Sequence, residues 1–186
     1  GILGLFGAIA LVLSCATGRV RRAPYPHESV LTVFAELKIF LDQDPYRQAP
    51  GRDLEGQNVF RVTLKRLDAL KGLTDASQSD VIAFGRGQCL ARLGAWPEAA
   101  EAFEAAAAAQ TSIEAEARAQ ARVCGRMAEL TDRTKFTPTL EGYLNDLDVL
   151  ERRLNQWLAE NPTPPTGSLI LREREYVQEE RVRLLF

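Results

Sequence analysis

Residues 80–111, DVIAFGRGQCLARLGAWPEAAEAFEAAAAAQT, decide how this chain folds. They predict two helices joined by a tight corner. Asp80 is placed to cap the first helix, because a short carboxylate accepts the unpaired N–H groups of a helix start. Gly94 suits the left-handed conformation that ends a helix. Pro97 fits the first turn of the second helix, where its missing N–H is no loss.

Small and apolar residues recur at helical spacing in both halves of this stretch. A glycine inside a helix costs stability compared with alanine, so Gly87 indicates that another helix approaches closely. The alanine run at 105–109 has the highest intrinsic helix propensity. The repeating positions are Ala83, Gly87, Leu90 and Gly94 in the first half, and Ala99, Phe103 and Ala106 in the second.

Small, large and aromatic residues follow one another in this hairpin in a fixed order. The positions are Gly87, Leu90, Gly94, Trp96, Ala99, Phe103 and Ala106. On these residues the hairpin resembles a tetratricopeptide repeat (TPR), a unit with a period of about 34 residues. It departs from the family where Ala83 replaces the usual tryptophan and Thr111 the usual proline. The alternative is an unrelated helical hairpin packed through alanine. The resemblance implies an all-α, right-handed superhelical stack of antiparallel helix pairs, a TPR-like α-solenoid.

Amphipathic helices are predicted on both sides of the hairpin. Residues 28–41 and 55–72 form a candidate first pair, which rests on apolar periodicity alone. Residues 113–130 and 139–160 form a candidate third pair. Three units agree with the number that a repeat stack needs for stability, so we expect a TPR-like helical domain over residues 28–160.

The third pair has the clearest sequence signals. Thr111 and Glu114 form a capping-box pattern before its first helix, and the sequence Asn161-Pro162 ends its second helix. The expected inward-facing side chains are Ile113, Ala117, Ala121 and Cys124 on the first helix, and Leu147, Leu150, Leu154 and Trp157 on the second.

A proline-rich linker at 161–167 separates these helices from a charged C-terminal helix at 168–186. Apolar residues recur every seven positions in that helix, at Ile170, Val177 and Leu184, so it can pack on the domain or on a partner. Its charged side chains are expected in solvent. They are Glu173, Arg174, Glu175, Glu179, Glu180 and Arg181.

The N-terminal segment is uncharged from residue 2 to residue 14. The sequence VLSC that ends at Cys15 resembles a bacterial lipobox, in which the cysteine becomes the lipid-carrying N-terminus. This resemblance implies a signal peptide or lipoprotein anchor over residues 1–15, lipidation of Cys15, and a tether over 16–27. Ala16 would permit sorting to the outer membrane of a diderm bacterium.

Two other interpretations of this segment stay open. It can be an uncleaved, single-pass inner-membrane anchor with Arg19, Arg21 and Arg22 on the cytoplasmic side, or a buried helix of the domain. Residues 2–18 would span roughly 25 Å as a helix, which is short for a hydrocarbon core of about 30 Å. The length therefore favours the lipoprotein.

Composition argues against nucleic-acid binding and against catalysis. The net charge is −2 and the pI is about 5.6, so no dominant basic surface follows from the totals. The sequence contains no phosphate-binding loop, paired histidines or nucleophile motif. We therefore predict no catalytic residue, metal site or cofactor, and give an enzyme acting on cell-wall material little support. Cys89 and Cys124 can pair in an oxidising compartment or stay as buried thiols.

The family resemblance also implies a concave groove lined by the first helix of each pair. The residues expected to bind a partner there are Phe84, Gln88, Arg92, Arg118, Arg122 and Arg126. The last three are spaced by four and form one row on a helix. Guanidinium groups favour carboxylates, so the expected partner is a protein or peptide segment with acidic side chains. The alternative is a solvated arginine row that Glu114 and Glu129 partly neutralise.

Together these features predict a membrane-tethered scaffold for protein–protein interaction in the bacterial cell envelope, on the periplasmic side. The alternative is a structural subunit of an envelope or outer-membrane assembly complex. A transient adaptor should have a polar groove, whereas a permanent subunit should expose a large apolar patch.

Overall fold

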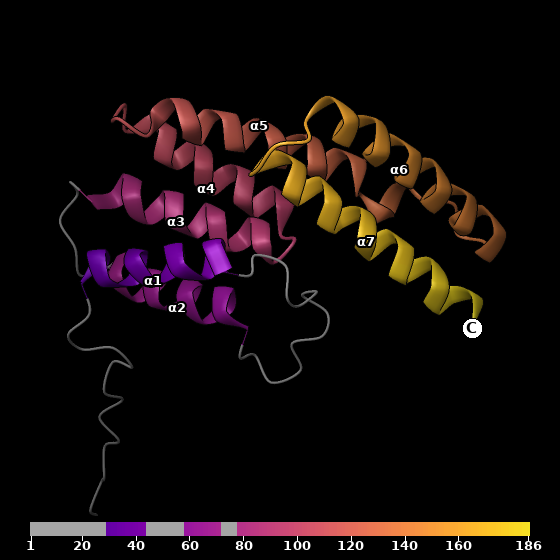
Figure 1. Cartoon of the computed structure of the whole chain (residues 1–186), viewed down its shortest axis with the longest axis horizontal. Coiled ribbons are helices and arrows are strands. Elements are labelled where there is room, and N and C mark those ends of the chain that lie inside the picture. Colours follow the sequence, from indigo (N-terminus) through magenta and orange to yellow (C-terminus); the bar gives the residue numbers. More distant parts are fainter. Residues whose placement is uncertain (1–28, 44–57, 72–77) are drawn as a thin grey trace, which may run out of the picture.

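A computed structural model describes residues 29–43, 58–71 and 78–186 (Figure 1). These residues form helices and no strand, which confirms the all-α prediction. The predicted anchor at 1–15, with Cys15, and the tether at 16–27 lie outside the described residues. The helices are α1 (Val30–Gln43), α2 (Val59–Lys71), α3 (Ser79–Arg92), α4 (Trp96–Ala108), α5 (Glu114–Leu130), α6 (Leu140–Glu160) and α7 (Thr166–Leu185), with a 3-10 turn at Arg133–Lys135.

Helices that follow one another in the chain pack side by side from α1 to α5, and α6 and α7 pack together at the other end (Figure 1). We expected α6 to pair with α5. Instead, α6 lies closer to α7 than to α5. The irregular connection between α5 and α6 includes the 3-10 turn, and α6 begins beyond the end of α5 in Figure 1. This offset leaves one long side of α6 open to α7.

The central hairpin has the predicted corner. Gly94 adopts a φ of 73°, and its N–H bonds the carbonyl of Ala91 at 3.2 Å. The Ala95 N–H bonds the carbonyl of Leu90 at 3.0 Å. Pro97 lies in the first turn of α4, as expected. These bonds satisfy backbone groups that a helix end leaves unpaired.

Gly87 lies where the Phe103 side chain of α4 comes close to the backbone of α3. A Cβ atom at this position would lie 2.8 Å from the ring of Phe103 on α4. That ring also packs edge-on against Phe84, with centroids 5.3 Å apart. The prediction that a second helix approaches Gly87 is confirmed.

Two predicted helix caps are wrong. The Asp80 carboxylate does not cap α3, which begins at Ser79 with no side-chain cap. Asp80 instead accepts a hydrogen bond of 2.7 Å from the Thr111 hydroxyl. Since Thr111 is engaged there, it does not form the capping box with Glu114, and α5 also begins without a side-chain cap. The bond ties the start of α3 to the loop before α5.

The core has two clusters that meet at α3. One cluster joins α1, α2 and α3, and includes Ile82 and Cys89. The other joins α3 to α7, and includes Phe84 and Ala91. Because α3 contributes to both clusters, it is buried on several sides. The four predicted inward residues of α6 are all buried: Leu147, Leu150, Leu154 and Trp157.

The C-terminal helix α7 belongs to the second cluster. Ile170 and Val177 are fully buried, as the seven-residue spacing predicted, whereas Leu184 is exposed. Glu173 and Glu180 were expected in solvent, but Glu173 is only 8% exposed and the Glu180 side chain only 13%. This expectation was wrong because the charged pattern of α7 does not show that Glu173 faces α4 and the 3-10 turn.

Two glycine substitutions test the packing of α3 on α4. Gly87→Ala should lower the free energy of unfolding by about 1–3 kcal/mol, because the new methyl group overlaps the Phe103 ring. Gly125→Ala on α5 is the matched control. Apart from its chain neighbours and the backbone of its own helix, no described atom lies within 4 Å of the position that its new methyl group would take, so it should raise stability by up to about 1 kcal/mol. Urea denaturation measures both, and equal effects would contradict the close approach.

Candidate binding surfaces

A hollow of about 530 Å³, here called the amide hollow, lies between α3 and α5. Its floor includes Ala91, Phe103 and Leu169, which are almost fully buried. The size falls within the range of pockets that hold small ligands or short peptide segments. It is lined by Leu41 and Asp42 of α1, Gln88, Ala91 and Arg92 of α3, Phe103 of α4, Glu116 and Gln120 of α5, and Pro164, Pro165, Ser168 and Leu169 around the start of α7.

Two primary amides, Gln88 and Gln120, line the amide hollow. Gln88 and Gln120 are both half-buried, and neither side chain makes a hydrogen bond among the residues that the structure describes. A primary amide offers two N–H donors and one carbonyl acceptor. This pattern complements a peptide group, which has one donor and one acceptor. The hollow also holds the cation Arg92, which is 8% exposed, and the carboxylates of Asp42 and Glu116.

The arginine row, Arg118, Arg122 and Arg126, lies on a different surface. It lines a hollow of about 810 Å³ between α4 and α5, together with Glu104 and Glu129. The structure therefore divides the six predicted groove residues. Gln88 and Arg92 line the amide hollow, the three arginines line the hollow beside α4, and Phe84 is buried against Phe103.

Two members of the arginine row already have partners. The Arg118 Nε donates to Glu114 at 2.9 Å, and the Arg126 guanidinium lies 4.4 Å from the centroid of the Trp157 ring. The exposed Arg118 pair contributes little stability, because solvent screens it. Arg122 is exposed between them. The row thus keeps cationic groups at the surface that can meet carboxylates.

A group of polar side chains, here called the Arg133 cluster, fastens α7 to its neighbours. Arg133 Nη2 lies 3.0 Å from Glu180 Oε2 and 3.6 Å from Glu173 Oε1. The Tyr143 hydroxyl donates to Glu180 at 2.6 Å, and the Trp96 indole donates to Glu173. The cluster joins the 3-10 turn, α4, α6 and α7. Sequence reasoning missed it, although Glu173 and Glu180 are seven residues apart, like the apolar residues of the same helix.

Burial dominates the electrostatics of the Arg133 cluster. Burial raises the pKa of the Glu173 carboxyl above its ordinary value, and the charge of Arg133 opposes this effect only in part. Burial also raises the pKa of Tyr143, and its hydrogen bond to Glu180 adds to the rise. No described hollow reaches these groups. The contacts of the cluster hold α7 against the 3-10 turn and α6.

The two cysteines of the helical region are free and buried. Cys89 belongs to the first core cluster and Cys124 to the second. Burial raises the pKa of each thiol to about 12. Since the thiolate is the reactive form, both behave as small apolar residues. Within the described ranges no group of three or more His, Cys, Asp or Glu side chains is placed to bind a metal ion.

Of the polar residues that line the amide hollow, Gln88 and Arg92 were named from the sequence but Gln120 was not. Gln120 lies two residues from both Arg118 and Arg122, on another side of α5, and no motif marks it. The contribution of the α7 start was also missed, because it depends on how α7 folds back. Asp42 could not be assigned to the lining of the amide hollow without knowing where α1 packs.

Comparison of the chain with protein-family models, with curated proteins and with solved structures gives no match. No helix in the described part of the chain combines the length and apolar character needed to cross a membrane.

The pKa of Glu173 gives a prediction for pH dependence. A raised pKa means that the folded protein holds this proton more tightly than the unfolded chain does. The contribution of Glu173 to the free energy of unfolding should therefore fall as pH rises above about 4.3, the ordinary value of a glutamate. Glu173→Gln should unfold at a higher urea concentration than the wild type at pH 7, and the difference should shrink towards pH 4.

Glu175→Gln is the control, because this side chain is exposed on the same helix. It should leave the urea midpoint unchanged at both pH values. If Glu173→Gln lowers the midpoint at pH 7, the attraction between Glu173 and Arg133 outweighs the cost of burial.

Proposed function

We propose that this chain is a membrane-tethered scaffold that holds a segment of a partner protein, with its helices arranged as a TPR-like superhelical stack. The observation that carries the proposal is the amide hollow, whose lining combines Gln88 and Gln120 with the buried apolar side chains of Ala91, Phe103 and Leu169. An extended segment can place a peptide group between the two amides. Its side chains would then meet Phe103 and the prolines at the start of α7.

The arginine side chains of this scaffold favour a partner of opposite charge. Arg92 lies at the amide hollow, and the arginine row lies on the neighbouring surface of α5. A guanidinium binds a carboxylate with two parallel hydrogen bonds when the geometry allows. We therefore propose a partner segment with acidic side chains, and neither a nucleic acid nor a substrate for catalysis.

The proposed tether is a lipid on Cys15. It would hold the scaffold on the periplasmic side of the cell envelope, at the outer membrane if the source is a diderm bacterium. Its support is the lipobox-like sequence and the short uncharged segment before it. A single-pass inner-membrane anchor is the alternative.

A second candidate function is a permanent structural subunit of an envelope complex. Its support is the group of exposed apolar side chains where α6 begins and α7 ends. Leu140 is 58% exposed and Val182 57% exposed. The hydrogen bond from Tyr143, one turn into α6, to Glu180 holds the start of α6 beside the end of α7. Exposed apolar side chains at the ends of two adjoining helices can belong to a surface that another chain covers.

Photocrosslinking in the source organism tests the binding proposal. A photoreactive residue at position 120 of the full-length protein should capture a defined partner segment, which mass spectrometry identifies as acidic. Adding Gln88→Ala should lower the yield about tenfold, since one amide partner of a buried peptide group is lost. The same photoreactive residue at the exposed position 156 on α6 is the control.

The outcomes separate the two candidate functions. A segment captured at 120 but not at 156 supports the scaffold. Capture of the same protein only from positions 140 and 182 supports the permanent subunit. Identical adducts from 120 and 156, unaffected by Gln88→Ala, would contradict the amide hollow as the binding site.

Intact-mass analysis and membrane fractionation of the full gene product test the tether. We expect a diacylglyceryl adduct on a chain that starts at Cys15, and loss of both the adduct and membrane association in Cys15→Ala. Cys124→Ala is a control that should leave membrane association unchanged. An unmodified chain that retains residues 1–14 in the membrane would replace the lipid tether with the inner-membrane anchor.

A further inference from the structure

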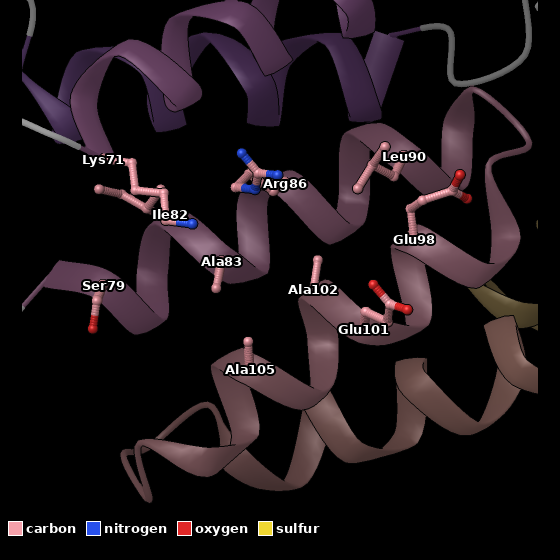
Figure 2. A pocket seen from close by; sticks show the side chains of 10 residues that line it. All are labelled: Lys71, Ser79, Ile82, Ala83, Arg86, Leu90, Glu98, Glu101, Ala102 and Ala105. Atoms are coloured by element: carbon pink, nitrogen blue, oxygen red, sulfur yellow. The ribbon is translucent and has the colours of Figure 1, made fainter.

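A third hollow, the α3–α4 trough, is lined by a different set of α3 residues from the amide hollow. Figure 2 shows the side chains that line it. Its volume is about 650 Å³, and it shares no lining residue with the amide hollow or with the hollow of the arginine row. The proposed function makes no use of it. Any role of this surface is therefore separate from the binding of the partner segment.

The floor of the trough allows a close approach. Ala83 lies on α3, and Ala102 and Ala105 lie on α4, all three directed into the hollow in Figure 2. Ile82 beside them is only 2% exposed. A backbone that packs over alanines comes nearer than one that packs over large side chains, so the trough can receive another helix.

The charges of the trough are separated along its length. Lys71 lies at the end that holds Ser79, and Glu98 and Glu101 lie at the opposite end, with Arg86 between them (Figure 2). Arg86 is already ion-paired with Asp68. Within the described part of the chain, Lys71, Glu98 and Glu101 form no ion pair and are exposed. The trough therefore has a cationic end and an anionic end, both open to a partner.

This pattern is complementary to itself. In a two-fold symmetric contact, residue i of one copy meets residue j of the other, and j meets i. If two copies pack antiparallel over the trough, the cationic end of each lies over the anionic end of the other. The same symmetry brings the alanine surfaces of the two α4 helices together. A parallel arrangement would instead place like charges opposite each other, which is unfavourable.

We propose that the α3–α4 trough is the contact surface of an antiparallel homodimer, in which Lys71 of each copy pairs with Glu98 and Glu101 of the other. An anionic lipid surface would bind poorly in the trough, because the carboxylates of Glu98 and Glu101 would face its negative charge. An unrelated protein would need to match both ends of the trough. A second copy matches them by symmetry.

Light scattering after size-exclusion chromatography of the full chain in mild detergent tests the dimer. The wild type should show a protein mass of twice 20.6 kDa. Lys71→Glu alone, and Glu98→Lys with Glu101→Lys in one chain, should each raise the dimer dissociation constant at least tenfold, because each places like charges opposite one another. Circular dichroism should show unchanged helix content, since all three residues are exposed.

Mixing the two charge variants is the decisive test of the antiparallel arrangement. In the mixed dimer, the glutamate at position 71 of one chain faces two lysines, and Lys71 of the other faces Glu98 and Glu101. The mixture should therefore recover the dimer mass. Glu104→Lys is the matched control, because this glutamate is on α4 but lines the hollow of the arginine row, and it should leave the dimer intact.

Three outcomes would overturn the proposal. They are a wild type that stays at the mass of one chain at all concentrations tested, charge variants that dimerise as well as the wild type, and a mixture that fails to recover the dimer mass. If the wild type is monomeric but a partner protein from the source organism protects Lys71 from chemical labelling, the trough binds another protein and the homodimer is wrong.

Discussion

The close packing of Phe103 against Gly87 is the contact on which the other surfaces depend. It sets the distance between α3 and α4, and Phe84 holds the same ring from the side. All three hollows are built on these two helices and their neighbours: the amide hollow and the α3–α4 trough border α3, and the hollow of the arginine row borders α4. A small change in this distance would alter each of them.

The Arg133 cluster provides the second constraint, because it joins α7 to the 3-10 turn and α6 beside the apolar contacts of Ile170 and Val177. Burying Glu173 has a cost, as the direction of its pKa shows. Such buried ionic groups often contribute less to stability than to choosing one arrangement among several. Here the arrangement chosen places Pro164, Pro165 and Ser168 on the wall of the amide hollow. The cluster therefore acts on the proposed binding site through the position of α7.

The proposed partner-binding and self-association surfaces are lined by different residues of α3, so one molecule can use both at once. A tethered dimer would present two amide hollows to the same partner or to a pair of partners. Linked sites raise the effective concentration for the second binding event without adding contacts. Weak binding in each hollow would then be sufficient to hold a partner that carries two segments.

The sequence by itself determined the central hairpin and the helices of the described residues, because periodicity, Gly94 and Pro97 act over a few neighbouring residues. It also marked Gly87 as a site of close approach and the inward residues of α6. Only the tertiary structure decided that Asp80 bonds Thr111 rather than capping α3, and that α6 packs along α7. It also separated Gln88 and Arg92 from the arginine row and added Gln120 to the amide hollow. The physical reason is that helix formation is local, whereas the side of a helix that meets a hollow depends on the packing of residues far apart in the chain.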